Sequence, residues 1–394
     1  MLIYQWCLID KFGNYLCSHN LQFGFKKHSG CANALYTVQQ VVNYYNERGS
    51  TIYMAALDAS KAFDRINHST LINKLVSRNM PQCVTDVIVN WYSKLHAAVR
   101  WNGILSHEFN LHCGVRQGGV LSPILFNLYM NDLIDQLDKG KFGCCLNDVY
   151  VGCTMYADDI LLLSASVVCL QSMLDRCCEY GKLHDIVFNC KKTVCMKVGS
   201  KWSCDISTML LNGVSLEWVD SFKYLGIMLM NGRNLHIDCN YIKRKFYTAT
   251  NSVLSKCKFA EEPLKLALVK ATCLPILLYC LGALCLPQHR VRQLGVCWND
   301  CFRKIFHYNR WDSVKELQYF CGELSFEYLY DLNKWNFLSN MRSSSTESSV
   351  MLQCDILIDE LVTTIVYPGH LRSWSMRQFF RIGPRIDSHK GDFF

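Results

Sequence analysis

The chain has 394 residues, of which 50% are hydrophobic, 12% aromatic and 19% charged, and its formal net charge is +8. This much apolar surface offsets the entropy cost of ordering, which excludes a disordered chain for most of the length, and the composition also excludes collagen, mucin and coiled-coil proteins. The length is sufficient for two or three domains, and the positive charge is compatible with an acidic partner.

The first part of the chain mixes helical and strand patterns. We predict helices over residues 31–48, 69–79, 83–95 and from 122 onward, a buried strand over 51–57, and a strand pair formed by 97–102 and 108–113 around Asn102-Gly103. Ser122 and Pro123 predict the start of the fourth helix, because serine supplies a capping oxygen and proline a preset φ angle.

The second part begins with a predicted β-hairpin and continues with mainly helical segments. We predict hairpin strands over 149–156 and 160–165, a helix over 167–184, strands over 194–198 and 222–230, helices through 238–308, a serine-rich linker over 343–349 and a weakly patterned tail over 350–394. Residues 271–288 are uncharged and apolar, but they contain Pro275, Gly282 and Pro287. This pattern favours a buried helix over a membrane span.

The 23 cysteines do not follow a disulfide or zinc pattern. No pair has the CxxC spacing, and no basic segment precedes an apolar stretch at the start of the chain, as it would in a signal peptide. The nearest approach to a metal cluster is Cys297, Cys301 and His307, whose cysteines we interpret as buried small hydrophobic residues. We therefore expect an intracellular protein with reduced thiols, located in the nucleus or the cytoplasm.

Positive charge is concentrated in one region. Residues 221–310 contain 14 Lys or Arg and 4 Asp or Glu, a net charge of +10, so the remaining residues carry −2. A basic helical region of this kind is typical of a surface that binds a polyanion, although charged runs are often only solvated faces.

Two adjacent carboxylates, Asp158 and Asp159, lie at the predicted hairpin tip, in the sequence Tyr156-Ala157-Asp158-Asp159. They repel each other, and no Lys or Arg lies within ten residues on either side. A divalent metal ion would resolve this repulsion, since hard cations take oxygen ligands. A solvated turn explains the same residues equally well on this evidence alone.

Two further elements precede the acid pair. Asp58 terminates the predicted strand, where a carboxylate can share metal ions with an acid pair on a neighbouring hairpin, and Phe63 follows five residues later. A glycine-rich loop over residues 114–121 lies directly before the helix that starts at Ser122, which allows its backbone to approach a ligand closely.

In this order, the three elements resemble the reverse transcriptases, specifically the polymerase of LINE-type (non-LTR) retrotransposons. The matching blocks are 21–40 (LQFGFKKHSGCANALYTVQQ, fingers), 57–71 (LDASKAFDRINHSTL, motif A), 114–133 (GVRQGGVLSPILFNLYMNDL, motif B), 156–159 (YADD, motif C), 185–193 (DIVFNCKKT, motif D) and 222–229 (FKYLGIML, motif E). Together they cover just over half of the chain.

The resemblance implies a role for each matching residue. Asp58, Asp158 and Asp159 would hold two Mg²⁺ ions, or Mn²⁺, with the carbonyl of Ala59; Phe63 would reject a ribose 2′-hydroxyl; Gln117 and Gly118 would contact the nucleotide; Lys192 would be the general acid; and Tyr224, Leu225 and Gly226 would form the primer grip. Lys191 is adjacent to Lys192, so the choice of general acid stays open. From the charge distribution we add Lys243, Arg244 and Lys245 as nucleic-acid contacts.

The implied fold is α+β: a right-hand polymerase palm with a small antiparallel sheet and helices on one face. We expect partial fingers over 1–50, the palm with motifs A to E over 51–235, a helical thumb over 236–290, and a helical C-terminal region over 291–342 before the linker and tail. The finger block that normally precedes LQFGF, an endonuclease domain and a CCHC knuckle are absent, so the sequence resembles an N-terminally truncated fragment of such an element.

The implied function is RNA-directed DNA synthesis, with an RNA template, a DNA primer and dNTPs as partners and no membrane. A catalytically inactive nucleic-acid-binding remnant stays open, because the finger block is missing although all three acids are present. An RNA-dependent RNA polymerase shares the palm, but Phe63 and the YADD hairpin favour dNTPs. A membrane protein is the third alternative.

Overall fold

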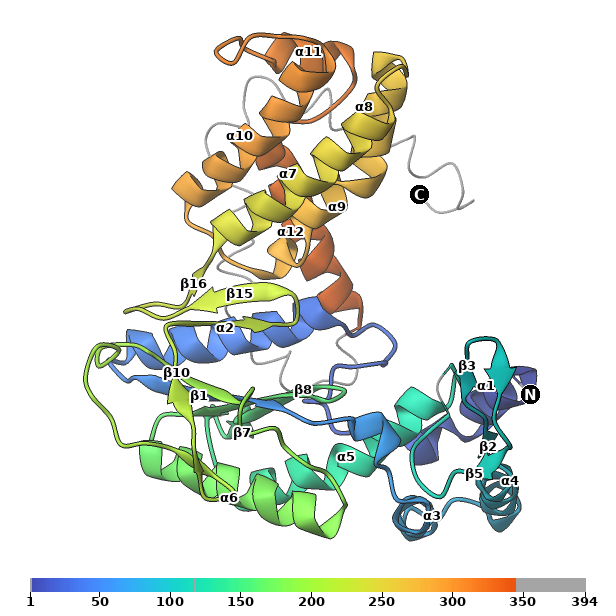
Figure 1. Ribbon diagram of the computed structural model, residues 1–394. Coiled ribbons are helices and arrows are strands. Elements are labelled where there is room, and N and C mark those ends of the chain that lie inside the picture. Colours follow the sequence, from blue (N-terminus) through green and yellow to red (C-terminus); the bar gives the residue numbers. More distant parts are fainter. Residues whose placement is uncertain (1, 117, 345–394) are drawn as a thin grey trace.

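The centre of the fold is a five-stranded sheet (Figure 1). The computed structural model describes residues 2–116 and 118–344. The strand order is β13 (Glu217–Trp218), β10 (Val194–Val198), β1 (Ile52–Asp58), β9 (Asp159–Ser164) and β8 (Cys153–Tyr156). Neighbouring strands are antiparallel except β10 and β13, which are parallel. The predicted α+β palm with its small sheet is confirmed, although the pair of β10 and β13 is parallel and not antiparallel.

Helices cover both faces of this sheet, so the expectation of helices on one face was wrong. On one side lie α5 (Ser122–Lys139) and α6 (Val167–Leu183), and on the other lies α2 (Cys31–Glu47) (Figure 1). All residues of α2 from Ala34 to Val42 are buried. The reason is that α2 packs against the sheet and also against η3 (Leu281–Ala283) of the C-terminal helical part.

The segment between β1 and α5 confirms two predicted helices and corrects a strand pairing. The helices are α3 (His68–Ser77), capped by the side chain of Asn67, and α4 (Gln82–Ser93). The predicted strands are paired differently: β2 (His96–Ala97) pairs with β5 (Phe109–Asn110), and an inner hairpin of β3 (Arg100–Trp101) and β4 (Ile104–Leu105) turns at Asn102-Gly103. Both turn residues have positive φ, which suits a two-residue hairpin turn.

Two further local predictions were wrong. Ser122 does not cap α5, because Leu121 is the N-cap residue and the Ser122 hydroxyl donates to the Arg116 carbonyl at 2.5 Å. Residues 222–230 are not one strand but a hairpin of β14 (Ser221–Tyr224) and β15 (Ile227–Met230), which continues to β16 (His236–Ile237). The chain reverses at Leu225 and Gly226, both with positive φ, and leucine gives no turn signal.

Several elements had no counterpart in the predictions. They include α1 (Leu2–Phe12), η1 (Gly13–Leu16), η2 (Ala62–Asp64), the hairpin of β11 (Leu210–Leu211) with β12 (Val214–Ser215), and β6 (Cys145–Leu146), which pairs with β7 (Val149–Tyr150). The pair β6–β7 means that the predicted strand over 149–156 is divided in two.

The region after β16 is helical, as predicted. It contains α7 (Cys239–Lys256), α8 (Glu262–Thr272), α9 (Leu274–Leu278), α10 (Gln288–Ile305), α11 (Lys315–Phe320) and α12 (Phe326–Ser344) (Figure 1). Because α12 continues to Ser344, it includes the first two residues of the predicted linker. Residues 345–349 and the predicted tail lie outside the described residues.

One stretch in this region, Glu262–Ala283, is long and apolar enough to cross a membrane by length and composition. In the fold it consists of α8, α9 and η3, and 44% of its apolar window is buried against the rest of the chain. The prediction of one buried helix over residues 271–288 was therefore wrong, because the end of α8, α9, η3 and the first residue of α10 (Gln288–Ile305) share this stretch.

The cysteines of α10 also behave as predicted. Cys297 and Cys301 are buried, whereas His307 is exposed. All 22 cysteines of the described residues are free thiols.

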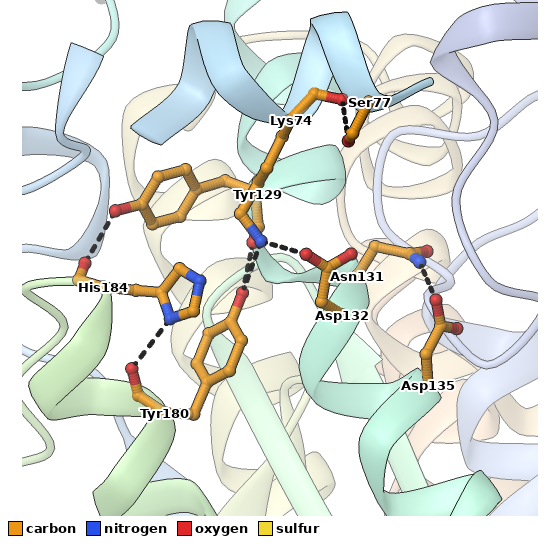
Figure 2. Close-up of polar contacts among 8 residues, drawn as sticks. All are labelled: Lys74, Ser77, Tyr129, Asn131, Asp132, Asp135, Tyr180 and His184. Atoms are coloured by element: carbon orange, nitrogen blue, oxygen red, sulfur yellow. Dashed lines mark hydrogen bonds and ion pairs between the residues drawn. The ribbon is translucent and has the colours of Figure 1, made fainter. Parts of the chain in front are cut away.

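A partly buried polar network joins α3, α5 and α6 (Figure 2). The ammonium of Lys74 forms an ion pair with Asp132 and donates to the Tyr180 hydroxyl at 3.2 Å, and this hydroxyl donates to the Tyr129 carbonyl. His184 stacks on Tyr180 with ring centroids 3.9 Å apart. We call Lys74, Asp132, Tyr129, Tyr180 and His184 the Lys74 network.

Candidate active site

The three predicted acids meet at one end of the central sheet. Asp58 is the last residue of β1, and it lies directly opposite Asp159, the first residue of β9. Asp158 precedes Asp159 in the turn between β8 and β9, where Ala157 has a φ of +54°. Residues that are 100 positions apart in sequence therefore lie together at one edge of the sheet, which we call the acid edge.

The acids of this edge disfavour each other's charged forms. Burial raises the pKa of Asp158, and the charge of Asp58 raises it further. Burial also raises the pKa of Asp159, with additional contributions from Asp158 and Asp58, while Lys223 acts in the opposite direction. Mutually repelling carboxylates are a local electrostatic conflict that a bound cation would relieve.

The fold brings two lysines to this edge, although neither lies near the acid pair in sequence. The ammonium of Lys192 lies 3.6 Å from the carboxylate of Asp58, and both side chains are well exposed. Lys223 of β14 acts electrostatically on Asp159. The backbone of Asp58 is itself fixed by the segment that carries Lys192: its carbonyl accepts from Asn189 at 2.8 Å and its N–H donates to the Thr193 hydroxyl at 3.4 Å.

The acid edge is open. Within residues 2–116 and 118–344, no group of three or more His, Cys, Asp or Glu side chains is gathered so that it could hold a metal ion. The donor set nevertheless fits hard divalent cations, because it consists of carboxylates and a backbone carbonyl. The carbonyl of Ala59, which the resemblance predicts as a ligand, is not used by the bridge between Ala59 and Phe188, because that bridge uses the Asp58 carbonyl and the Ser60 N–H.

Phe63 and Gly118, predicted to contact the nucleotide, line the same pocket. The pocket has a volume of about 300 Å³ and is also lined by Val115, Arg116 and the start of α5. The Phe63 ring stacks on Phe126 of α5, with centroids 4.2 Å apart and an interplanar angle of 16°. This stacking fixes the ring at the pocket wall. Gln117, the third predicted nucleotide contact, lies outside the described residues.

The predicted primer-grip residues form the turn between β14 and β15. The hydroxyl of Tyr224 is buried and lies 3.2 Å from that of Thr154 in β8, which attaches the turn to the strand leading to the acids. From the other side, Tyr279 donates to the Leu225 carbonyl at 3.2 Å, and its ring lies so close to Gly226 that a Cβ there would be 2.9 Å from it. The turn is thus held between the sheet and the helical C-terminal part.

Lys243, Arg244 and Lys245 lie in the first turns of α7. Arg244 is 3.8 Å from Asp238, the N-cap residue of this helix, and the Lys245 ammonium lies 4.6 Å from the centroid of the Tyr241 ring. Lys245 and, to a smaller extent, Lys223 lower the pKa of Tyr241. Tyr241 therefore lies near both the basic start of α7 and Lys223 of β14.

The sequence predictions missed Gln22. Its side chain is 1% exposed and pairs with the backbone of Ala157 in the acid-bearing turn: the side-chain oxygen accepts from the Ala157 N–H at 2.9 Å, and the side-chain nitrogen donates to the Ala157 carbonyl at 3.4 Å. The only signal in the sequence was a polar residue between the apolar Leu21 and Phe23, two positions before Gly24.

The chain was compared with known proteins. A family model described as reverse transcriptase (RNA-dependent DNA polymerase) matches residues 8–229, which is more than half of the chain. The chain is 31% identical over 214 residues to a Pol polyprotein from the type-2 retrotransposable element R2DM of Drosophila melanogaster, covering 52% of this chain and 20% of that protein.

Other relatives show the same pattern. Identity is 23% to a Pol polyprotein from the type-1 retrotransposable element R2 of Popillia japonica, covering 66% of this chain and 44% of that protein. It is 28% to the RNA-directed DNA polymerase from the mobile element jockey of Drosophila funebris, covering 53% and 23%. The chain therefore spans less than half the length of these curated relatives.

Among solved structures, apo telomerase from Candida tropicalis aligns over 89% of this chain and 55% of that chain. The identity is 13% and the TM-score 0.44. A likeness at this level carries no argument about function.

Proposed function

Because the chain belongs to the reverse transcriptase family, we propose that it is an RNA-directed DNA polymerase that adds dNTPs to a primer 3′-hydroxyl. The observation that carries this proposal is the acid edge, in which Asp58 and Asp159 are register partners and Asp158 is adjacent. The primer 3′-oxygen attacks the α-phosphorus of the dNTP, and the bond between this phosphorus and the pyrophosphate oxygen breaks.

We assign each part of this reaction to residues of the chain. Asp58, Asp158, Asp159 and the Ala59 carbonyl would hold two Mg²⁺ or Mn²⁺ ions. Such ions, when bound, activate the hydroxyl and neutralise charge on the leaving pyrophosphate. Lys192 is the general acid of this proposal, since its ammonium already reaches the Asp58 carboxylate, and it would give its proton to the departing pyrophosphate oxygen.

Sugar selection is assigned to Phe63. The ring is held by its stacking on Phe126 and borders the pocket that Gly118 also lines, with Gln117 of the same loop as a further contact. A ribose 2′-hydroxyl placed against this ring would lose its hydration without gaining a hydrogen bond, which disfavours ribonucleotides.

The primer–template would lie between the primer-grip turn and the basic face of α7. Tyr224, Leu225 and Gly226 place the primer terminus, because the turn is attached to the same hairpin that carries Asp158. Lys243, Arg244 and Lys245 would contact backbone phosphates, since phosphate contacts bind without reading sequence. The partners are thus an RNA template, a DNA primer and dNTPs.

We assign the predicted boundaries to functional parts: fingers to residue 50, palm over 51–235, thumb over 236–290 and a helical extension beyond. An intracellular location, in the nucleus or cytoplasm, suits the free thiols of the described residues.

The test is primer extension on an RNA template. Wild-type protein with poly(rA), oligo(dT), Mg²⁺ and dTTP should extend the primer, and chelation of the metal should stop it. Extension with UTP but not dTTP would instead indicate an RNA polymerase. A chain that binds the duplex without extending it with either nucleotide would be the inactive remnant.

A further inference from the structure

We propose that Gln22 is a positioning residue that holds the acid-bearing turn in its metal-binding conformation. Its side-chain amide pairs with both the N–H and the carbonyl of Ala157, the residue directly before Asp158. The inference rests on the proposed function in one respect, namely that the acids of this turn bind divalent cations.

The turn needs an external support. Ala157 has a φ of +54°, a left-handed conformation that residues with a Cβ rarely adopt, and such conformations persist where the surroundings impose them. Ala157 is also 4% exposed, so water cannot readily replace a missing partner of its backbone groups.

Gln22 is itself rigidly placed. Its oxygen also accepts from the Gly24 N–H at 3.0 Å, and the Gly24 carbonyl accepts from the buried Asn127 of α5 at 2.6 Å. The backbone on either side of Gln22 bonds to β8: Phe23 donates to the Met155 carbonyl and Met155 donates to the Leu21 carbonyl, both at 2.8 Å. The amide is therefore fixed to the strand that enters the turn and to the helix of the nucleotide pocket.

Gly24 gives independent support for close contact. A Cβ at this position would lie 2.7 Å from the Ala157 nitrogen, so the segment can approach the turn only because residue 24 is glycine. A Gly24→Ala variant should therefore displace the turn while keeping the Gln22 side chain.

The chain contains a matched control. Gln39 of α2 is 4% exposed and pairs in the same way with the backbone of Cys285, accepting from its N–H at 2.8 Å and donating to its carbonyl at 3.4 Å. Loss of this amide removes the same two hydrogen bonds away from the acids.

The experiment measures Mn²⁺ binding to the full chain by electron paramagnetic resonance, together with thermal unfolding. Gln22→Met should weaken Mn²⁺ binding about tenfold and raise the Mg²⁺ concentration needed for primer extension by a similar factor. Adding Ala157→Gly should restore Mn²⁺ affinity to within about threefold of wild type, because glycine adopts positive φ without strain. Gln39→Met should lower thermal stability and leave Mn²⁺ affinity unchanged.

Unchanged Mn²⁺ affinity in both Gln22→Met and Gly24→Ala would overturn the inference, as would an equal loss in Gln39→Met or a wild-type chain that binds no Mn²⁺. A wild-type chain that binds Mn²⁺ in a Gln22-dependent manner but extends no primer would uphold the inference and reject the proposed polymerase function.

Discussion

The acid edge and the Lys74 network both place aspartates beside a lysine, but they differ in how far the chain itself satisfies these charges. In the Lys74 network the lysine side chain is 9% exposed, and its ammonium is bonded to Asp132 and Tyr180 (Figure 2). At the acid edge, Lys192 is 68% exposed and lies 3.6 Å from one of three carboxylates. The first arrangement is closed and stabilises the packing of three helices. The second leaves negative charge for a ligand to neutralise.

The two regions also differ in the consequence of burial. Burial lowers the pKa of Lys74, and Asp132 opposes this effect by its hydrogen bond and its charge, so Asp132 favours the charged form of the buried lysine. Burial and mutual repulsion raise the pKa of Asp158 and Asp159, so the acid edge carries its charges at a cost to the fold. Residues retained at such a cost are characteristic of function.

The strongest test of this comparison makes the same substitution, aspartate to asparagine, in each of the two regions. Asp158→Asn should reduce primer extension by roughly 1,000-fold or more, the scale of removing one member of a catalytic unit. Thermal stability should stay level or rise slightly, because one repulsive charge is gone. Single-turnover extension and calorimetry on one preparation test this, and wild-type-like extension would contradict the assignment of the acids.

Asp132→Asn should have the opposite effect. The substitution leaves the buried Lys74 charge without its anionic partner. We expect the free energy of unfolding to fall by about 2 kcal/mol. This loss is smaller than for fully buried ion pairs, because the Asp132 side chain is 44% exposed. Extension per folded molecule should be unchanged. Urea denaturation measures this, and the double variant Lys74→Met/Asp132→Asn should recover most of the loss. Unchanged stability in the single variant would show that the network is not the closed arrangement described above.

Phe63→Ala tests the pocket that Phe63 and Gly118 line. Without the ring, the ratio of dNTP to rNTP incorporation should fall by about tenfold or more, since a contact of this size discriminates by roughly 1–3 kcal/mol. The ratio of kcat/KM values for dTTP and UTP is the measurement. Unchanged discrimination would mean that Phe63 serves only to pack against Phe126.

Charge reversal of Lys243, Arg244 and Lys245 to Glu tests whether these basic side chains contact the phosphates of the primer–template duplex. Duplex affinity should fall, and the plot of log K against log salt should become flatter. The slope should change by up to about 0.9 for each phosphate that is no longer neutralised on a B-form duplex, and by a different amount on a hybrid. Mn²⁺ binding should stay the same. An unchanged slope would identify these side chains as a solvated helix face.

The smallest effect concerns pH and the Lys74 network. Burial lowers the pKa of His184, as does the charge of Lys74, so the unfolded chain binds this proton more tightly than the folded one. Stability should therefore decrease as pH falls below about 6.5, the value for an unperturbed histidine. In His184→Gln the difference between urea denaturation at pH 7.5 and 5.5 should be smaller. It should not vanish, because burial lowers the pKa of His19 in the same way. An unchanged difference would place the pH dependence elsewhere.

The acid edge was easier to predict from the sequence than the Lys74 network, because its signals lie in short continuous segments. Tyr156 to Asp159 is a continuous signal between two apolar strands, and Asp58 ends a third, so strand pairing alone brings the acids together. Lys74 reaches partners 58 and 106 residues away through side chains, and nothing in the spacing along α3 indicates them. Gln22 is 135 residues from Ala157, and the turn at Leu225 lacks a turn residue at its first position. Long-range contacts made by single side chains leave no periodic pattern.

The most direct test of the distinction between the two regions is Mn²⁺ binding to wild type, Asp58→Asn/Asp158→Asn and Asp132→Asn, measured by electron paramagnetic resonance. We predict saturable binding in wild type and Asp132→Asn, and its loss in the double variant, which should remain folded. Equal binding in all three proteins, or loss in Asp132→Asn alone, would contradict the assignment of the acid edge as the metal-binding site.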